Sequence, residues 1–119
     1  MDTRIKKLEN GDYDAILLSK AGIEALGLDN KITQEFNTEE LIPCAGQGII
    51  AIQCRENDQE IINILEKIND NQSRIIANAE RNVLKILEGD CDTAVGVYAK
   101  ISKDIVNIKA ELFSVDGKQ

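Results

Sequence analysis

The segment at residues 37–48 (NTEELIPCAGQG) constrains the fold most, because it interrupts the regular patterns on either side of it. It holds the chain's only proline, Pro43, and two glycines that flank Gln47. Proline lacks a backbone donor and glycine adopts conformations closed to other residues, so this stretch favours a turn over a helix or strand. The chain of 119 residues has room for one modest core and is too short for two domains. We interpret the break as a crossover between structural units.

Before this break, residue spacing predicts a helix, a strand and a second helix. Helical spacing of apolar residues occurs at 3–11 and again at 20–28, where Gly27 is the expected end. The compact apolar run at 13–19 is typical of a strand buried on both faces. A further short strand is expected at 32–36. These elements together indicate part of an α/β unit.

After the break, the pattern predicts a strand, two amphipathic helices and an antiparallel hairpin. The expected order is a strand at 49–55, helices at 56–68 and 74–89 with N-cap residues in 70–73, and strands at 94–102 and 105–115 joined at Lys103–Asp104. The buried face of the second helix is expected to consist of Ile76, Ala79, Val83, Ile86 and Leu87. The predicted fold class is therefore α/β (α+β), with helices packed on a small antiparallel sheet.

Charge and composition exclude several classes of function. The net charge is −7, with 21 acids against 14 bases, which argues against nucleic acid as a partner. The longest uncharged apolar run, at 48–52, is too short to span a membrane, and charged residues near Met1 do not resemble a signal peptide. A cytoplasmic location is expected.

The absence of histidine limits the chemistry available to the chain. Without imidazole, the usual activation of a serine or cysteine nucleophile is excluded. The three cysteines, Cys44, Cys54 and Cys91, are too few and too widely spaced to form a structural zinc site by themselves. No metal site is predicted.

Cys91 lies in the stretch LEGDCDTAVG, just past a glycine that is expected to end a helix. Its acidic neighbours, Asp90 and Asp92, and the negative end of that helix disfavour a thiolate. A buried, inert cysteine is one interpretation. Attachment of an electrophilic group through a stable thioether is the other, because that bond forms once and needs no lasting thiolate.

The other candidate site residues also allow two interpretations. The two glycines around Gln47 would let a backbone approach a ligand closely, but they also suit an ordinary tight turn. Arg4, Arg55 and Arg81 could bind carboxylates through bidentate hydrogen bonds, or could simply be solvated surface residues. Glu80, next to Arg81, is expected to pair with a neighbouring lysine.

The order of these motifs resembles the porphobilinogen deaminase (hydroxymethylbilane synthase) family. The motifs are TR-x-x-KL-x-x-G-x-YDA, AG-x-x-x-LGL, LP-x-x-GQG-x-x-AI-x-CR with Ile42 in place of the leucine, and AER-x-x-L-x-x-LEG-x-C. The resemblance covers almost the whole chain, from Thr3 to Gly117. It implies a transferase of tetrapyrrole (heme) biosynthesis that condenses four porphobilinogen units, one at a time, to give hydroxymethylbilane.

The resemblance also implies roles for individual residues. Cys91 would carry a dipyrromethane cofactor through a thioether, with Arg4, Gln47 and Gly48 in the cofactor site. Arg4, Arg55 and Arg81 would bind the carboxylates of porphobilinogen and of the growing polypyrrole. No residue of this chain can be assigned as the catalytic aspartate, because Asp12, Asp14 and Asp92 do not match its segment.

Besides Ile42, four residues depart from the family pattern. Asp90 replaces a glycine before the cysteine, and Thr93-Ala94 replaces a frequent Val-Pro after it. Ala25 takes the place of an arginine that binds substrate. Since family members are much longer, the isolated chain is expected to be inactive.

The resemblance implies a division of the chain into three pieces of a larger enzyme. These are residues 1–40 from the second α/β domain, 41–70 as a hinge returning to the first domain, and 71–119 from the C-terminal domain. Such pieces would need the N-terminal region as a partner, or would self-associate. The alternatives to an enzyme are a non-enzymatic module that binds a small anion and a self-associating piece without activity.

Overall fold

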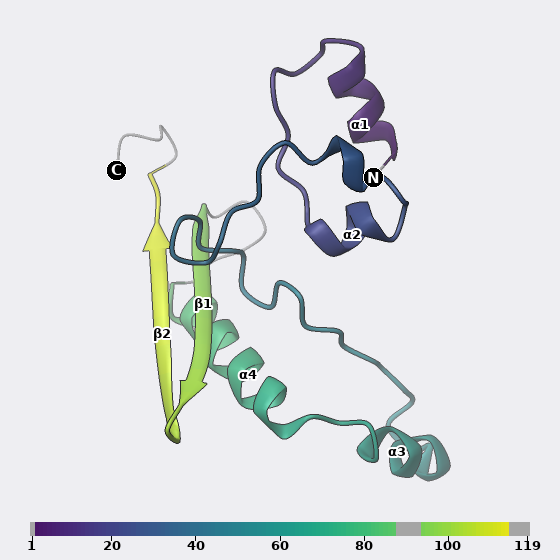
Figure 1. Ribbon diagram of the computed structural model, residues 1–119. Coiled ribbons are helices and arrows are strands. Elements are labelled where there is room, and N and C mark those ends of the chain that lie inside the picture. Colours follow the sequence, from purple (N-terminus) through teal and green to yellow (C-terminus); the bar gives the residue numbers. More distant parts are fainter. Residues whose placement is uncertain (1, 88–93, 115–119) are drawn as a thin grey trace. The chain divides into compact units, whose positions relative to one another are not determined.

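The computed structural model describes residues 2–87 and 94–114, with the chain divided into two compact units (Figure 1). The first unit is Met1–Asn37 and the second is Thr38–Gln119. The described residues combine helices with an antiparallel sheet, so the predicted mixed α/β class is confirmed. The three-part domain division implied by the resemblance stays a prediction.

The first unit consists of short helices joined by irregular segments. They are α1 (Asp2–Glu9), α2 (Lys20–Glu24) and the 3-10 helix η1 (Asp29–Lys31). Ile5 is buried, and ion pairs of 2.7 Å join Lys31 to Glu9 and Lys20 to Glu35. Both predicted helices are confirmed, although α2 is shorter than expected.

The second unit is built around a hairpin that packs against one long helix. Its elements are α3 (Gln59–Glu66), α4 (Asn71–Ile86), β1 (Val95–Ser102) and β2 (Ile105–Leu112). The strands pair antiparallel from Val95 opposite Leu112 to Ser102 opposite Ile105. Lys103 and Asp104 have φ angles of 50° and 63°, the conformation of a type I′ turn. The predicted helices and hairpin are confirmed.

Helix α4 covers the hairpin mainly through β1 (Figure 1). Val97 and Ala99 of β1 are 0% and 2% exposed, and they form the core of this unit. At its start, α4 is capped by Asp70, whose side chain accepts a hydrogen bond of 2.6 Å from the Ser73 N–H. The Ser73 donors lower the pKa of Asp70 below its ordinary value. The predicted N-cap is confirmed.

Three predicted strands are absent from the described structure. Residues 13–19, 32–36 and 49–55 have no strand structure, and apolar side chains within them are exposed: Leu17 by 65%, Ile50 by 89% and Ile52 by 60%. A strand requires a neighbour to pair with its backbone groups, and the two described strands pair with each other. These predictions were wrong because periodicity reports the tendency of a segment and not the presence of its partner.

The predicted buried face of α4 was partly wrong. Ile76, Ala79 and Val83 are partly buried, but Ile86 is 79% exposed and Leu87 is 39% exposed. The last turn of the helix therefore extends past the hairpin surface that covers the earlier turns. Within residues 2–87 and 94–114, no helix has the length and hydrophobicity that crossing a bilayer requires.

Candidate functional site

The glycine-rich part of the break forms a tight turn at residues 45–48. The Gln47 N–H donates to the Cys44 carbonyl and the Ile49 N–H donates to the Gly46 carbonyl, both at 3.0 Å. Gly46 and Gly48 have φ angles of 78° and 84°, where a side chain would be strained. Gln47 is exposed at the tip of this turn. The glycines are thus explained by turn geometry, and the amide of Gln47 remains accessible.

Glu80 is buried at the contact between this turn, α4 and β1. The residue is only 3% exposed. Oε2 accepts a hydrogen bond of 2.7 Å from the Gly46 N–H, and Oε1 accepts one of 2.7 Å from the Ala99 N–H. The expected pairing of Glu80 with a lysine was therefore wrong. The two acceptor oxygens bind main-chain donors from segments 34 and 19 residues away.

The sequence contained a signal for Glu80 that the prediction missed. Glu80 lies four residues after Ile76 and three before Val83, so it falls on the apolar stripe of α4. A carboxylate on such a stripe must be desolvated when the helix packs, which is tolerated only if donors compensate it. Its burial could have been inferred, but its partners could not.

Two further contacts hold the break against β1. The Val97 N–H donates to the Pro43 carbonyl at 2.8 Å. A Cβ placed on Gly96 would lie 2.8 Å from the Ile42 carbonyl oxygen. The approach of β1 to the backbone of the break is therefore so close that it requires glycine at position 96. Residues 42–46, Glu80 and residues 96–99 together are called the Glu80 junction below.

The Glu80 junction involves both elements that flank Cys91. Helix α4 ends at Ile86, and β1 begins at Val95. The Ala94 carbonyl accepts a hydrogen bond of 2.8 Å from the Phe113 N–H, which holds the start of β1 to the end of β2. Cys91 itself, together with residues 88–90 and 92–93, lies outside the described residues.

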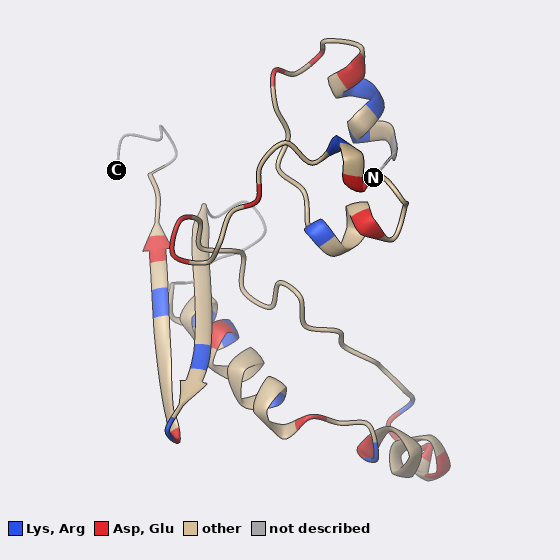
Figure 2. Ribbon diagram, viewed as in Figure 1, with Lys and Arg blue, Asp and Glu red and all other residues tan. Residues whose placement is uncertain are grey.

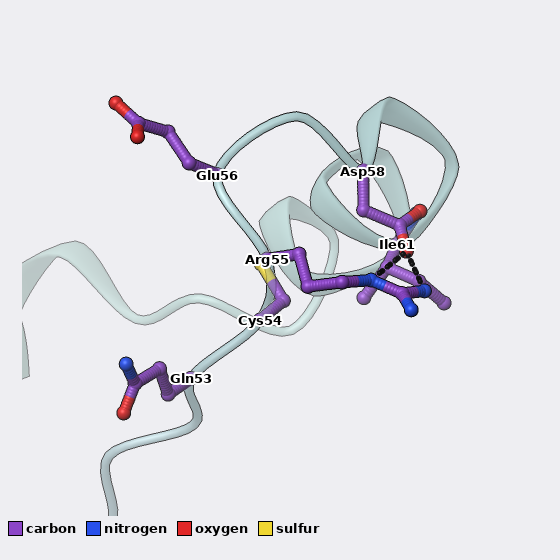
Figure 3. A pocket seen from close by; sticks show the side chains of 6 residues that line it. All are labelled: Gln53, Cys54, Arg55, Glu56, Asp58 and Ile61. Atoms are coloured by element: carbon purple, nitrogen blue, oxygen red, sulfur yellow. Dashed lines mark hydrogen bonds and ion pairs between the residues drawn. The ribbon is translucent and has the colours of Figure 1, made fainter.

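Arg55 belongs to a separate depression beside the start of α3 (Figure 3). Its guanidinium points toward Asp58, with 3.2 Å between Nε and Oδ2, and the Arg55 side chain is 87% exposed. Asp58 also caps α3 by accepting from the Ile61 N–H at 3.3 Å. Arg55 is therefore held by a carboxylate of its own chain, with which an anionic ligand would compete. The depression is lined by Gln53, Cys54, Arg55, Glu56, Asp58 and Ile61.

Arg4 and Arg81 are exposed cations in different units. Arg4 lies on α1, in a depression that also contains Lys7 and Tyr13, and the Lys7 ammonium is 6.0 Å from the centre of the Tyr13 ring. Arg81 is exposed on α4, directly after Glu80. Among the described residues, neither arginine forms an ion pair.

The structure thus brings only some of the predicted site residues together. Gln47 and Gly48 are linked to the helix of Arg81 through Glu80, whereas Arg55 lies in its own depression and Arg4 belongs to the first unit. Basic and acidic residues are interspersed along the ribbon of both units (Figure 2). In the described ranges, no group of three or more His, Cys, Asp or Glu is arranged to hold a metal ion.

Comparison with known proteins matches both parts of the chain to one family. The profile described as "Porphobilinogen deaminase, dipyromethane cofactor binding domain" matches residues 1–63, which is more than half of the chain. The profile described as "Porphobilinogen deaminase, C-terminal domain" matches residues 75–119. The chain belongs to the porphobilinogen deaminase family. The resemblance inferred from the motifs is confirmed.

Curated relatives named porphobilinogen deaminase align with almost all of the chain. The protein of Exiguobacterium sibiricum is 43% identical over 121 residues, which cover 100% of this chain and 39% of the relative. The protein of Fusobacterium nucleatum is 44% identical over 117 residues, covering 98% and 39%. That of Francisella tularensis subsp. novicida is 40% identical over 119 residues, covering 100% and 40%. The chain therefore spans about two fifths of the length of these porphobilinogen deaminases.

Proposed function

We propose that the chain supplies part of a porphobilinogen deaminase, a transferase that condenses four porphobilinogen units into hydroxymethylbilane. The observation that carries this proposal is the match of two family profiles, one after the other, to residues 1–63 and 75–119. A module that merely binds a small anion would not be expected to match both in this order.

The residues of this chain would hold the cofactor and the carboxylates of the pyrroles. The Cys91 sulfur would form the thioether to a dipyrromethane. Porphobilinogen units would then be added to the free pyrrole carbon at the other end of this cofactor. Each addition forms one carbon–carbon bond and releases one ammonia. Arg4, Arg55 and Arg81 would neutralise acetate and propionate groups through charge-assisted hydrogen bonds.

The donors around the Gly46–Gly48 turn fit such a polyanionic ligand. Gln47 is exposed, and the Gly48 N–H has no hydrogen-bond acceptor among the described residues. Arg81 comes directly after Glu80 in the sequence, and the Glu80 carboxylate accepts a hydrogen bond from this turn. An amide, a backbone N–H and a guanidinium are the donor types that bind carboxylates and carbonyls. This chemistry supports the roles proposed for Gln47, Gly48 and Arg81.

The isolated chain is proposed to be inactive in the repeated condensations that produce and release hydroxymethylbilane. It spans about 39% of the length of its relatives, and none of its aspartates matches the segment of the catalytic aspartate. Proton transfer at the pyrrole nitrogens would therefore lack its carboxylate. Loading of the cofactor from porphobilinogen needs one such condensation and occurs once, whereas turnover needs four more in every cycle, so loading is the function to test in this chain.

Cys91→Ser is expected to abolish a covalent adduct of dipyrromethane mass. The purified chain is incubated with porphobilinogen, and the intact mass is measured before and after incubation. Cys44→Ser removes an exposed cysteine that has no proposed role, and should leave the adduct in place. An adduct that persists in Cys91→Ser, or is lost in Cys44→Ser, would contradict the attachment site. An unmodified wild-type chain would show that this length cannot retain the cofactor.

We further propose that the chain associates, either with the remainder of a full-length enzyme or with a second copy. Large apolar side chains are exposed in both units, including Leu17, Ile50, Ile105 and Leu112. Exposed apolar surface on this scale marks an interaction surface in soluble proteins. Light scattering of the purified chain should give a mass at least twice 13.1 kDa. A monomer that melts cooperatively would argue against this association.

A further inference from the structure

We propose that Glu80 is a positioning residue that fixes the Gly46–Gly48 turn relative to α4 and β1. The inference rests on the proposed function, since it assigns Glu80 a role in placing Gln47 and Arg81 for one ligand. Glu80 would not touch the ligand. It would act through the backbone of the turn and of β1.

Glu80 joins Gly46 to Ala99, and this pair of hydrogen bonds is called the clamp below. The residue is 3% exposed, and each carboxylate oxygen accepts one main-chain N–H at 2.7 Å. A buried carboxylate is costly unless its oxygens are bound, and charge-assisted bonds to N–H groups are among the strongest available. Within the described residues, no lysine or arginine pairs with it. The Glu80 carboxylate therefore binds main-chain N–H groups, and its two oxygens fix the positions of Gly46 and Ala99.

This clamp connects two parts of the proposed site. Gln47 directly follows Gly46, and Arg81 directly follows Glu80. Ala99 lies on β1, and β1 and α4 are the two elements that flank residues 88–93. Loss of the Glu80 hydrogen bonds would let the Gln47 amide move relative to the Arg81 guanidinium, and α4 move relative to β1. The relative placement of Gln47 and Arg81 therefore depends on one carboxylate.

Amide hydrogen exchange of Glu80→Gln tests the clamp without any ligand. Glutamine has one acceptor oxygen, so it can keep at most one of the two bonds. Exchange at residues 44–49 and at Ala99 should become faster by about tenfold or more, the size expected for a lost hydrogen bond to a charged group. Asp70→Ala is the control, because it removes the N-cap at the start of α4, a contact that involves neither Gly46 nor Ala99. Unchanged exchange in Glu80→Gln, or an equal increase in Asp70→Ala, would overturn the proposal.

A second variant covers the case in which Glu80→Gln does not fold. Glu80→Asp keeps both acceptor oxygens but withdraws them by one methylene, so the same amides should exchange faster than in the wild type. Protection at residues 44–49 equal to that of the wild type would contradict the clamp.

Cofactor loading separates this inference from the proposed function. If the wild-type chain acquires the adduct from porphobilinogen, Glu80→Gln should acquire it at a rate lower by about tenfold, while Asp70→Ala should load normally. Equal loading of Glu80→Gln and wild type would overturn the positioning role. If the wild-type chain stays unmodified, the proposed loading fails, and the exchange comparison alone decides whether Glu80 is the clamp.

Discussion

Glu80→Ala is expected to lower the free energy of unfolding by about 3 kcal/mol, through the loss of two hydrogen bonds to a charged group. The two donors left behind differ in their cost. Ala99 is 2% exposed, so its N–H would stay buried without an acceptor, whereas Gly46 is only partly buried and water can reach it. Most of the loss should therefore come from the bond to Ala99.

Urea denaturation followed by circular dichroism measures this effect. Arg81→Ala is the matched control, because it truncates the adjacent, exposed side chain on the same helix and should change stability by less than about 0.5 kcal/mol. Equal midpoints for the two variants would show that Glu80 contributes nothing beyond a surface residue. A reduced slope together with a reduced midpoint would instead indicate that the junction opens before the rest of the second unit.

Gly96→Ala is expected to destabilise the second unit by about 1–3 kcal/mol, the usual cost of overpacking. The added Cβ would lie 2.8 Å from the Ile42 carbonyl oxygen and 3.1 Å from two side-chain atoms of Ile42. The nearest atom belongs to the backbone, which cannot rotate away as a flexible side chain would. Relief requires that β1 and the break separate, and this would stretch the bond from the Val97 N–H to the Pro43 carbonyl.

Lys100→Ala serves as the control for Gly96→Ala, because Lys100 is exposed on the same strand. The urea midpoint should fall for Gly96→Ala and stay nearly constant for Lys100→Ala. In addition, the Val97 amide should exchange faster in Gly96→Ala. A wild-type midpoint for Gly96→Ala would mean that the approach of β1 to Ile42 is not close enough to require glycine.

The elements that sequence predicted correctly are those stabilised by contacts close in sequence. The Asp70 cap bonds Ser73, three residues later, and the Lys103–Asp104 turn joins strands that pair with their immediate neighbour in sequence. Helical spacing, N-caps and type I′ turns act over a few residues. Such features can be inferred from local patterns, and α1, α3, α4 and the hairpin were.

The elements that were predicted wrongly need partners that are distant in sequence. Residues 13–19 and 49–55 have the composition of buried strands, but the described residues provide no strand beside them. Ile50 is accordingly 89% exposed. The family relatives are about two and a half times as long as this chain, since it covers 39% of them. We propose that the remaining length of such an enzyme supplies the partner strands.

For the candidate site too, sequence predicted some features and the structure was needed for others. The ordered motifs identified the family and named Cys91, Arg4, Gln47, Gly48, Arg55 and Arg81, because a family is defined by residue types at fixed separations. The roles of these residues stay predictions, and Cys91 lies outside the described residues. Sequence alone also indicated a turn within residues 37–48, because proline and glycine interrupt helices and strands.

Only the tertiary structure decided how the break, α4 and β1 are joined. The sequence shows a glutamate on the apolar stripe of a helix, but its two acceptors could have met a lysine, water or backbone. The fold brings Gly46 and Ala99 to 2.7 Å from those oxygens, although they are separated from Glu80 by 34 and 19 residues. Hydrogen bonds over such separations depend on how the elements pack, and no local pattern encodes that packing.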